Sequence, residues 1–191
     1  MTNSDLKRLK DSVCDSLKIK PNKQIFTIEE KESKSKIKKL IFTFKNKDDV
    51  FIIRQDPNQH TTSVLKKYST NSSCDFVVFS MGKNKRLTIC FCEVKSSYCE
   101  KIYKKAYEQV SSSYLFVKYL LECYKFFYDD DTFLADISYK YYYVCPKIGI
   151  SNKRQISKNK SKNDIYLSIK AVKEEYGVVT INDGYGFLTE N

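Results

Sequence analysis

The sequence predicts a single α/β domain in which a central mixed β-sheet is flanked by helices, and three observations lead to this class. First, 191 residues suffice for one globular domain. Second, hydrophobic residues make up 41% of the chain and aromatic residues 14%, so a sizeable core can form and wholesale disorder is excluded. Third, short apolar segments of strand length are interspersed with amphipathic segments of helix length.

The first third of the chain is expected to hold one helix followed by short strands. Ser4 and Asp5 are good N-cap residues, apolar residues follow at helical spacing, and Pro21 closes the segment, so we expect a helix over about 5–18. Strands are expected over 24–28, 37–44 and 50–53, with a charged connection over 29–36, a hairpin turn over 45–49 and a polar loop over 54–73.

The rest of the chain contains the strongest signal for a sheet. The segment 87–94 is apolar at positions of both faces, which is typical of a central strand, and 75–79 precedes it as a shorter strand. We expect a long helix over 98–127, a strand over 139–144, a helix over 164–176 ended by Gly177, and a hairpin of 178–181 with 185–188. The domain core then spans about 5–146, with a basic loop over 151–163 and 164–191 as an appendage.

One group of charged residues conflicts with its apolar surroundings. Glu93 and Lys95 lie at the end of the most apolar strand and, two residues apart, project from the same face. Asp75 begins the preceding strand, so an antiparallel pairing with a turn near Gly82 would bring its carboxylate opposite Glu93. We therefore expect two carboxylates and an ammonium group to converge at one edge of the sheet.

This constellation suits metal-assisted hydrolysis of a phosphodiester bond. Asp75, Glu93 and the backbone carbonyl of Val94 are candidate ligands for Mg²⁺, which prefers oxygen donors, and Mn²⁺ can substitute. Such a metal lowers the pKa of a bound water and neutralises charge on the phosphate. Lys95 is the candidate residue for orienting the water or stabilising the transition state.

At these residues the chain resembles the PD-(D/E)XK, or restriction-endonuclease-like, nuclease superfamily. The family pattern is an acidic residue, a variable gap and then (D/E)-x-K, which reads here as Asp75 and Glu93-Val94-Lys95. The resemblance implies a restriction-endonuclease-like core ordered as helix, three strands, helix and strand. It also implies that Gln109, on the following helix, supports the catalytic site. Cys74 replaces the usual proline, and Ser113 stands where one branch has tyrosine.

Some members of that superfamily use an acidic residue of the first helix. Asp11, Asp15 and Glu32 are the candidates in this chain, with no order among them. The Tyr141-Tyr142-Tyr143 run is interpreted as core packing rather than a base-stacking platform, because strand alternation buries one side of it. His60 is expected to be an ordinary surface residue.

The net charge of +11 and pI near 9.2 favour a polyanionic partner, either nucleic acid or an anionic membrane surface. DNA is favoured over RNA as the substrate. Only four of the 34 basic residues are Arg, which argues against extensive bidentate reading of bases. The phosphate-binding candidates are the basic residues of the 151–163 loop, namely Lys153, Arg154, Lys158, Lys160 and Lys162.

Cysteine usage and hydropathy bear on compartment and partners. Seven Cys without a CxxC pair and a single His disfavour a zinc site, and free thiols favour the cytoplasm. The most apolar long segment, 114–127, is interrupted by charges and is too short to span a bilayer, so no membrane association is expected. A homodimer or a partner subunit fits the superfamily resemblance.

Two other classes of function remain open. The chain is alternatively a catalytically inactive nuclease-fold module that binds nucleic acid or protein, with vestigial carboxylates and a basic loop that makes the contacts. It is otherwise an interaction protein such as an inhibitor or an assembly subunit, which would bind no nucleic acid even at low salt. The superfamily analogy places an active enzyme in restriction, phage defence or mobile-element functions.

Overall fold

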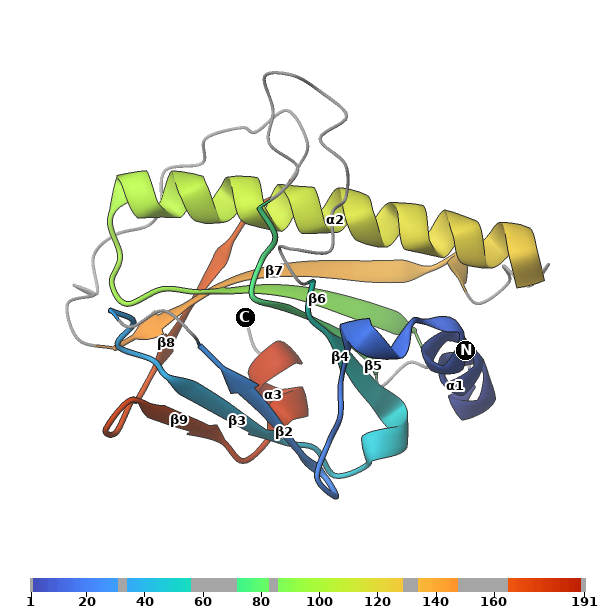
Figure 1. The fold of residues 1–191 in the computed structure, drawn as a ribbon, viewed down its shortest axis with the longest axis horizontal. Coiled ribbons are helices and arrows are strands. Elements are labelled where there is room, and N and C mark those ends of the chain that lie inside the picture. The colour runs from blue at the N-terminus through green and yellow to red at the C-terminus, as the bar shows by residue number, and fades with distance from the viewer. Residues whose placement is uncertain are drawn as a thin grey trace.

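The computed structural model describes residues 2–30, 34–55, 72–82, 86–128, 134–147 and 165–189 (Figure 1). The helices are α1 (Asn3–Ser12), α2 (Glu100–Tyr128) and α3 (Gly184–Thr189), with 3₁₀ turns η1 (Asp15–Leu17) and η2 (Lys47–Asp49). The strands are β1 (Lys18–Ile19), β2 (Ile25–Glu29), β3 (Lys39–Thr43), β4 (Val50–Ile53), β5 (Phe76–Met81), β6 (Leu87–Val94), β7 (Ile137–Pro146), β8 (Ser168–Val172) and β9 (Val178–Ile181).

A six-stranded mixed sheet of order β1-β4-β5-β6-β7-β8 forms the centre of the fold. From β1 to β6 neighbouring strands are antiparallel, whereas β7 and β8 continue the sheet in parallel. All eight residues of β6 are buried, which confirms the expected central strand. Because β6 and β7 are parallel, the chain must cross over between them, and α2 provides that crossover.

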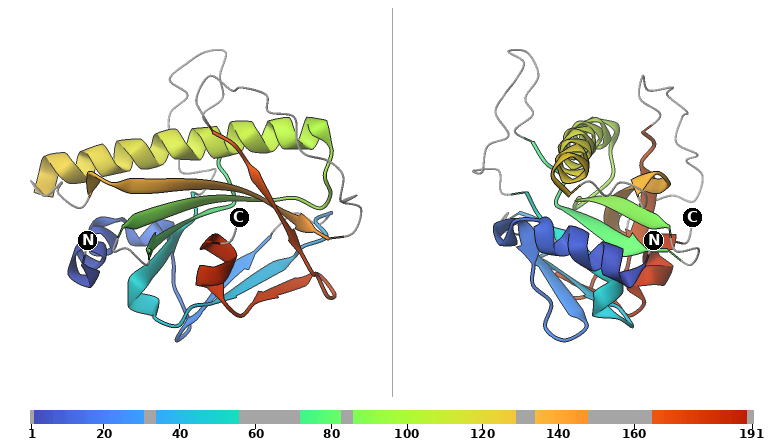
Figure 2. Two further views of the ribbon diagram at one scale, coloured as in Figure 1. Left: turned by 180° about the vertical axis from the view of Figure 1, so that it is seen from behind. Right: turned by 90° about the vertical axis from the view of Figure 1, so that its right-hand side faces the viewer.

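A second sheet of order β2-β3-β9 lies on the face of the main sheet opposite to α2 (Figures 1 and 2). One core cluster fills the space beneath α2 and α1, where Phe91, Val117 and Tyr143 are buried. The other cluster fills the space between the two sheets and α3, where Phe42 and Phe76 meet edge-to-face at 5.6 Å. The main sheet is therefore covered on both faces, which explains why its strands are almost continuously apolar.

The C-terminal part differs from the sequence-based expectation. No helix covers 165–176 among the described residues, since Ser168–Val172 is β8 and pairs in parallel with β7. Gly177, expected to end a helix, lies in the turn that precedes β9 with a φ of +83°. Residues 185–188 form α3 instead of a strand. This segment is thus built into both sheets rather than appended to the core, because the main sheet offers β8 an open edge that local sequence does not reveal.

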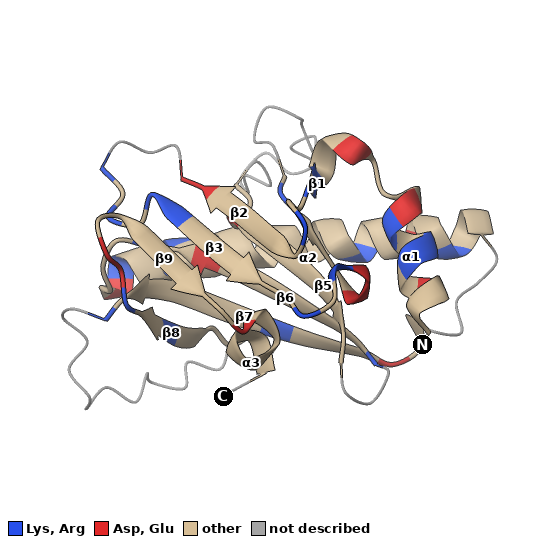
Figure 3. Cartoon of the chain, turned by 90° about the horizontal axis from the view of Figure 1, so that it is seen from below, with Lys and Arg blue, Asp and Glu red and all other residues tan. Residues whose placement is uncertain are grey.

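Two further local expectations are corrected. The 45–49 segment is not a hairpin turn, since β3 pairs with β2 and β9 while β4 belongs to the main sheet. The first helix ends at Ser12 rather than near residue 18, because Leu17 ends η1 and β1 then pairs with β4. Within the described ranges, no helix combines the length and the apolarity required to cross a membrane. Lys and Arg are distributed over several elements rather than gathered on one (Figure 3).

Candidate active site

The antiparallel pairing of β5 and β6 brings Asp75 beside Glu93, as expected from the sequence. Phe76 pairs with Cys92, so Asp75, directly before β5, is opposite Glu93 near the end of β6. The Asp75 amide donates a hydrogen bond to Glu93 Oε2 at 3.1 Å. The Val94 amide in turn donates to Asp75 Oδ2 at 2.6 Å. Each carboxylate is thus held by a backbone amide of the facing segment, which fixes the two groups relative to each other.

Lys95 completes the group on the solvent side. Its Nζ forms an ion pair with Glu93 Oε1, and its side chain retains 21% exposure whereas that of Glu93 is fully buried. The Lys95 amide donates to the Val144 carbonyl at 2.8 Å, which continues the β6–β7 ladder past the last residue of β6. Lys95 is therefore fixed at its backbone and lies between a buried carboxylate and solvent.

Burial raises the pKa of both carboxyl groups, Asp75 and Glu93. Loss of hydration and, to a smaller extent, the neighbouring Asp75 charge raise the pKa of Glu93, the Lys95 ammonium opposes both effects, and the net result is a pKa of about 8. Loss of hydration also raises the pKa of Asp75, against the stabilising Val94 amide and Lys95. At neutral pH the pair therefore tends to retain a proton, and a bound divalent cation would favour its release.

Helix α2 is attached to the segment that leads into Asp75. Gln109 Nε2 donates to the Ser73 carbonyl at 3.1 Å, while its Oε1 is buried and accepts no hydrogen bond from the described residues. Ser113 Oγ accepts from the Cys74 amide at 2.9 Å and donates to Gln55 Oε1 at 2.8 Å. These contacts hold residues 73–74, and with them the backbone of Asp75, against the helix.

Ser113 and Gln55 are site-supporting residues that the sequence reasoning missed. The available signal was a serine on the otherwise apolar inward stripe of the helix, where a buried hydroxyl requires a partner. No sequence signal indicated Gln55, because its position beside the site follows from the pairing of β4 with β5.

Glu30 is an acidic residue outside the motif that acts on Asp75. Glu30, directly after β2, raises the pKa of Asp75 through its charge, whereas Arg54 lowers it. Asp15 is exposed and paired with Lys18 at 2.7 Å, and Asp11 is exposed on α1. Glu32 lies outside the described residues.

The remaining candidates divide into packed residues and residues outside the described ranges. Tyr142 and Tyr143 are buried and Tyr141 stacks on Phe91 at 5.4 Å, so the tyrosine run packs in the cores as predicted. His60 lies outside the described residues, as do the predicted phosphate-binding residues of the basic loop, Lys153, Arg154, Lys158, Lys160 and Lys162.

The oxygen ligands at this site are of the type that binds a hard cation, such as Mg²⁺, that takes few ligands from the protein. Among the described residues, no group of three or more His, Cys, Asp and Glu is positioned to hold a metal. Mg²⁺ is commonly bound through only one or two carboxylates, with water and substrate phosphate completing its shell. Asp75 and Glu93 supply two carboxylates of this kind, Glu93 Oε1 is paired with Lys95 in this structure, and the Val94 carbonyl remains a predicted third donor. The Val94 amide, in contrast, has an observed role in fixing Asp75.

In comparisons with known proteins, no family model, no curated protein and no solved structure matches the chain. The class that the structure defines is an α/β protein with a mixed six-stranded sheet and a paired-carboxylate site at the end of its central strands.

Proposed function

We propose that the protein is a metal-dependent nuclease that hydrolyses phosphodiester bonds, with DNA as the favoured substrate. The observation that carries this proposal is the convergence of Asp75, Glu93 and Lys95 at one end of β5 and β6. Two adjacent carboxylates with a partly exposed ammonium group provide the acidic and basic groups that phosphodiester hydrolysis with a divalent cation requires.

Asp75 and Glu93 would hold Mg²⁺, or Mn²⁺ in its place, and the metal would supply a water of lowered pKa and positive charge at the phosphate. Hydrogen bonds from the Asp75 and Val94 backbone amides hold the two carboxylates beside each other before a cation arrives, and the Lys95 ammonium would give way to the cation at Glu93 Oε1. With a cation held by the two carboxylates, Lys95 would orient the attacking water or stabilise charge on the phosphate oxygens.

Gln109 supports this site through the strand that carries Asp75. Its hydrogen bond to the Ser73 carbonyl lies two residues before Asp75, so it acts on the position of that carboxylate. Its buried Oε1 accepts no hydrogen bond from the described residues, and a bound water is a chemically suitable partner for it.

The fold is consistent with a nuclease of the restriction-endonuclease-like class. Helix α1 is followed by β4, β5 and β6 of the main sheet, then by α2 and β7, in the order helix, three strands, helix and strand. The β1 strand at the sheet edge and the β2-β3-β9 sheet are additions to that order. The net charge of +11 suits a nucleic-acid substrate, and restriction or phage defence in the cytoplasm is the setting that we propose.

Cleavage of single- and double-stranded DNA and RNA with Mg²⁺ or Mn²⁺, with EDTA as a control, tests this proposal. We expect wild-type protein to cleave DNA, and Lys95→Ala and Asp75→Asn to abolish cleavage while retaining a folded circular dichroism spectrum. Lys125→Ala is the matched control, because Lys125 also pairs with a carboxylate but lies on the exposed side of α2. Unchanged cleavage by Lys95→Ala would refute the catalytic assignment.

A catalytically inactive binding module is the second candidate. The burial of Glu93 and its ion pair with Lys95 favour it. Glu93 is fully buried and forms an ion pair with Lys95. In this alternative, Asp75, Glu93 and Lys95 have a purely structural role, called here a structural clasp, because their contacts join the ends of β5 and β6. Calorimetric titration with Mg²⁺ or Mn²⁺ separates the two. A clasp binds no divalent cation, whereas the proposed nuclease binds one and loses it in Asp75→Asn.

A further inference from the structure

We propose that the outward face of the C-terminal half of α2 is an interface through which two copies of this chain associate as a two-fold symmetric dimer. Nuclease activity is not required for this association.

Helix α2 carries two apolar faces in this region. Val110, Val117 and Leu121 are buried against the main sheet, as expected for a covering helix. Beside this buried face, large or soft side chains recur at intervals of three, four and three residues, the spacing of a coiled-coil seam, at positions Phe116, Tyr119, Cys123 and Phe126. Of these, Phe116 also packs partly against the core. A helix that covers a sheet needs only one apolar face, so the second face requires a partner.

The outer face is exposed in the single chain. Phe126 is 83% exposed, Phe127 76% and Tyr119 70%. Of the eight exposed large hydrophobic side chains among the described residues, five lie within 115–128. Single exposed hydrophobic residues are ordinary, but a contiguous group of this kind marks an interaction surface.

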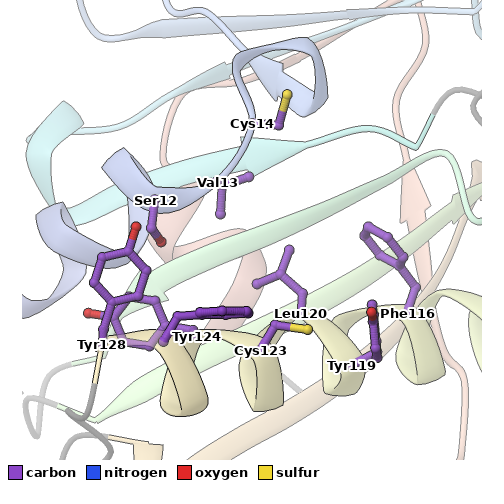
Figure 4. A pocket seen from close by; sticks show the side chains of 10 residues that line it. Ser12, Val13, Cys14, Phe116, Tyr119, Leu120, Cys123, Tyr124 and Tyr128 are labelled. Carbon is purple, nitrogen blue, oxygen red and sulfur yellow. The ribbon is translucent and has the colours of Figure 1, made fainter.

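The same face also contains a groove that can receive a side chain of a second copy. The groove has a volume of about 650 Å³ and lies between α2 and the end of α1 (Figure 4). Its apolar lining includes Val13, Phe116, Leu120, Tyr124 and Phe127. A two-fold axis places the same patch of both copies in contact. Tyr119, Phe127 and Tyr128 themselves line the groove, so Phe126 is the exposed ring that each copy can insert into the groove of the other.

The area and the charges fit a second copy. If each aromatic ring offers about 200 Å², the exposed aromatic side chains provide on the order of 600 Å² per copy, close to the ~800 Å² of a standard interface. The flank of the seam carries Lys118, Glu122 and Lys125, of mixed sign. In an antiparallel helix pair the same flanks meet, which brings Glu122 of each copy near Lys118 of the other.

Sedimentation equilibrium over a concentration series from micromolar upward tests the dimer. We expect wild-type protein to dimerise and Phe126→Glu and Tyr119→Lys to raise the dimer dissociation constant by at least about tenfold. Because these side chains are exposed, the variants should keep the wild-type circular dichroism spectrum and thermal midpoint. Tyr176→Glu is the matched control, since Tyr176 is a fully exposed aromatic residue away from the patch, and it should leave the constant unchanged.

A charge reversal tests the antiparallel arrangement. Glu122→Lys should weaken the dimer by placing like charges together, and the added Lys118→Glu should restore it. Wild-type protein that stays monomeric throughout, or Phe126→Glu protein that dimerises as wild type does, would overturn the proposal. Monomeric protein that floats with anionic lipid vesicles would overturn it as well and assign the face to a lipid surface.

Discussion

The buried Glu93 carboxyl group should make the stability of this protein fall between mildly acidic and mildly basic pH. Its pKa is about 8 in the folded chain, against 4.5 for an unperturbed glutamic acid. The folded protein therefore retains a proton that the unfolded chain releases. The resulting stabilisation is fully present below the unfolded pKa and is lost as pH rises through the folded one.

The magnitude follows from the difference in proton affinity. A tenfold change in affinity corresponds to about 1.4 kcal/mol, so roughly 3 kcal/mol of unfolding free energy should be lost between about pH 5 and about pH 8. Glu93→Gln cannot ionise, and its amide oxygen can still accept the hydrogen bond from the Asp75 amide. We expect its stability to vary much less over the same range.

Urea unfolding of wild type and Glu93→Gln at several pH values measures this effect. The slope of unfolding free energy against pH is compared between wild type and Glu93→Gln, so that the contribution of Glu93 is separated from those of other titrating groups. Glu122→Gln serves as the control for an exposed, ion-paired glutamate. Equal slopes in wild type and Glu93→Gln would refute the buried-carboxyl reasoning. If the site binds Mg²⁺, a concentration of 100 times Kd should add about 2.7 kcal/mol to wild type near pH 8 and much less to the variant.

Two further predictions concern the attachment of α2 and the packing of α3. Ser113→Ala removes two buried hydrogen bonds and should lower the unfolding free energy by about 2 kcal/mol in urea titrations. Ser111→Ala is its control and should be neutral or stabilising, because the Ser111 hydroxyl is buried without a hydrogen-bond partner among the described residues; an equal loss in both variants would contradict the assignment. Gly184→Ala should lower the thermal midpoint at a cost of about 1–3 kcal/mol, since a Cβ there would lie 2.5 Å from the Phe44 ring. Gly186→Ala would place a Cβ 2.7 Å from the Asp183 carboxylate, which accepts a hydrogen bond from the Gly186 amide but can rotate, so its loss of stability should be smaller than that of Gly184→Ala.

The central part of the fold can be predicted from local sequence because its apolar pattern is strong and its strand pairing involves residues close together in the chain. The extent of β6 was predicted as observed, since eight consecutive residues fit a strand with both faces covered. The approach of Asp75 to Glu93 was equally predictable, because a short antiparallel connection fixes the register of β5 against β6. The proximity of Asp75, Glu93 and Lys95, which we propose as catalytic, follows from that register.

The remainder was decided by contacts between distant parts of the chain. Residues 168–172 form a strand because the parallel edge of β7 accepts them, and the preference of the segment alone suggested a helix. Gln55 and Ser113 meet across 58 positions of sequence, and Glu30 acts on Asp75 from a different sheet. The sequence by itself thus determined the paired carboxylates, whereas only the tertiary structure determined their burial, their raised pKa and the residues that hold them, because these depend on which surfaces exclude water.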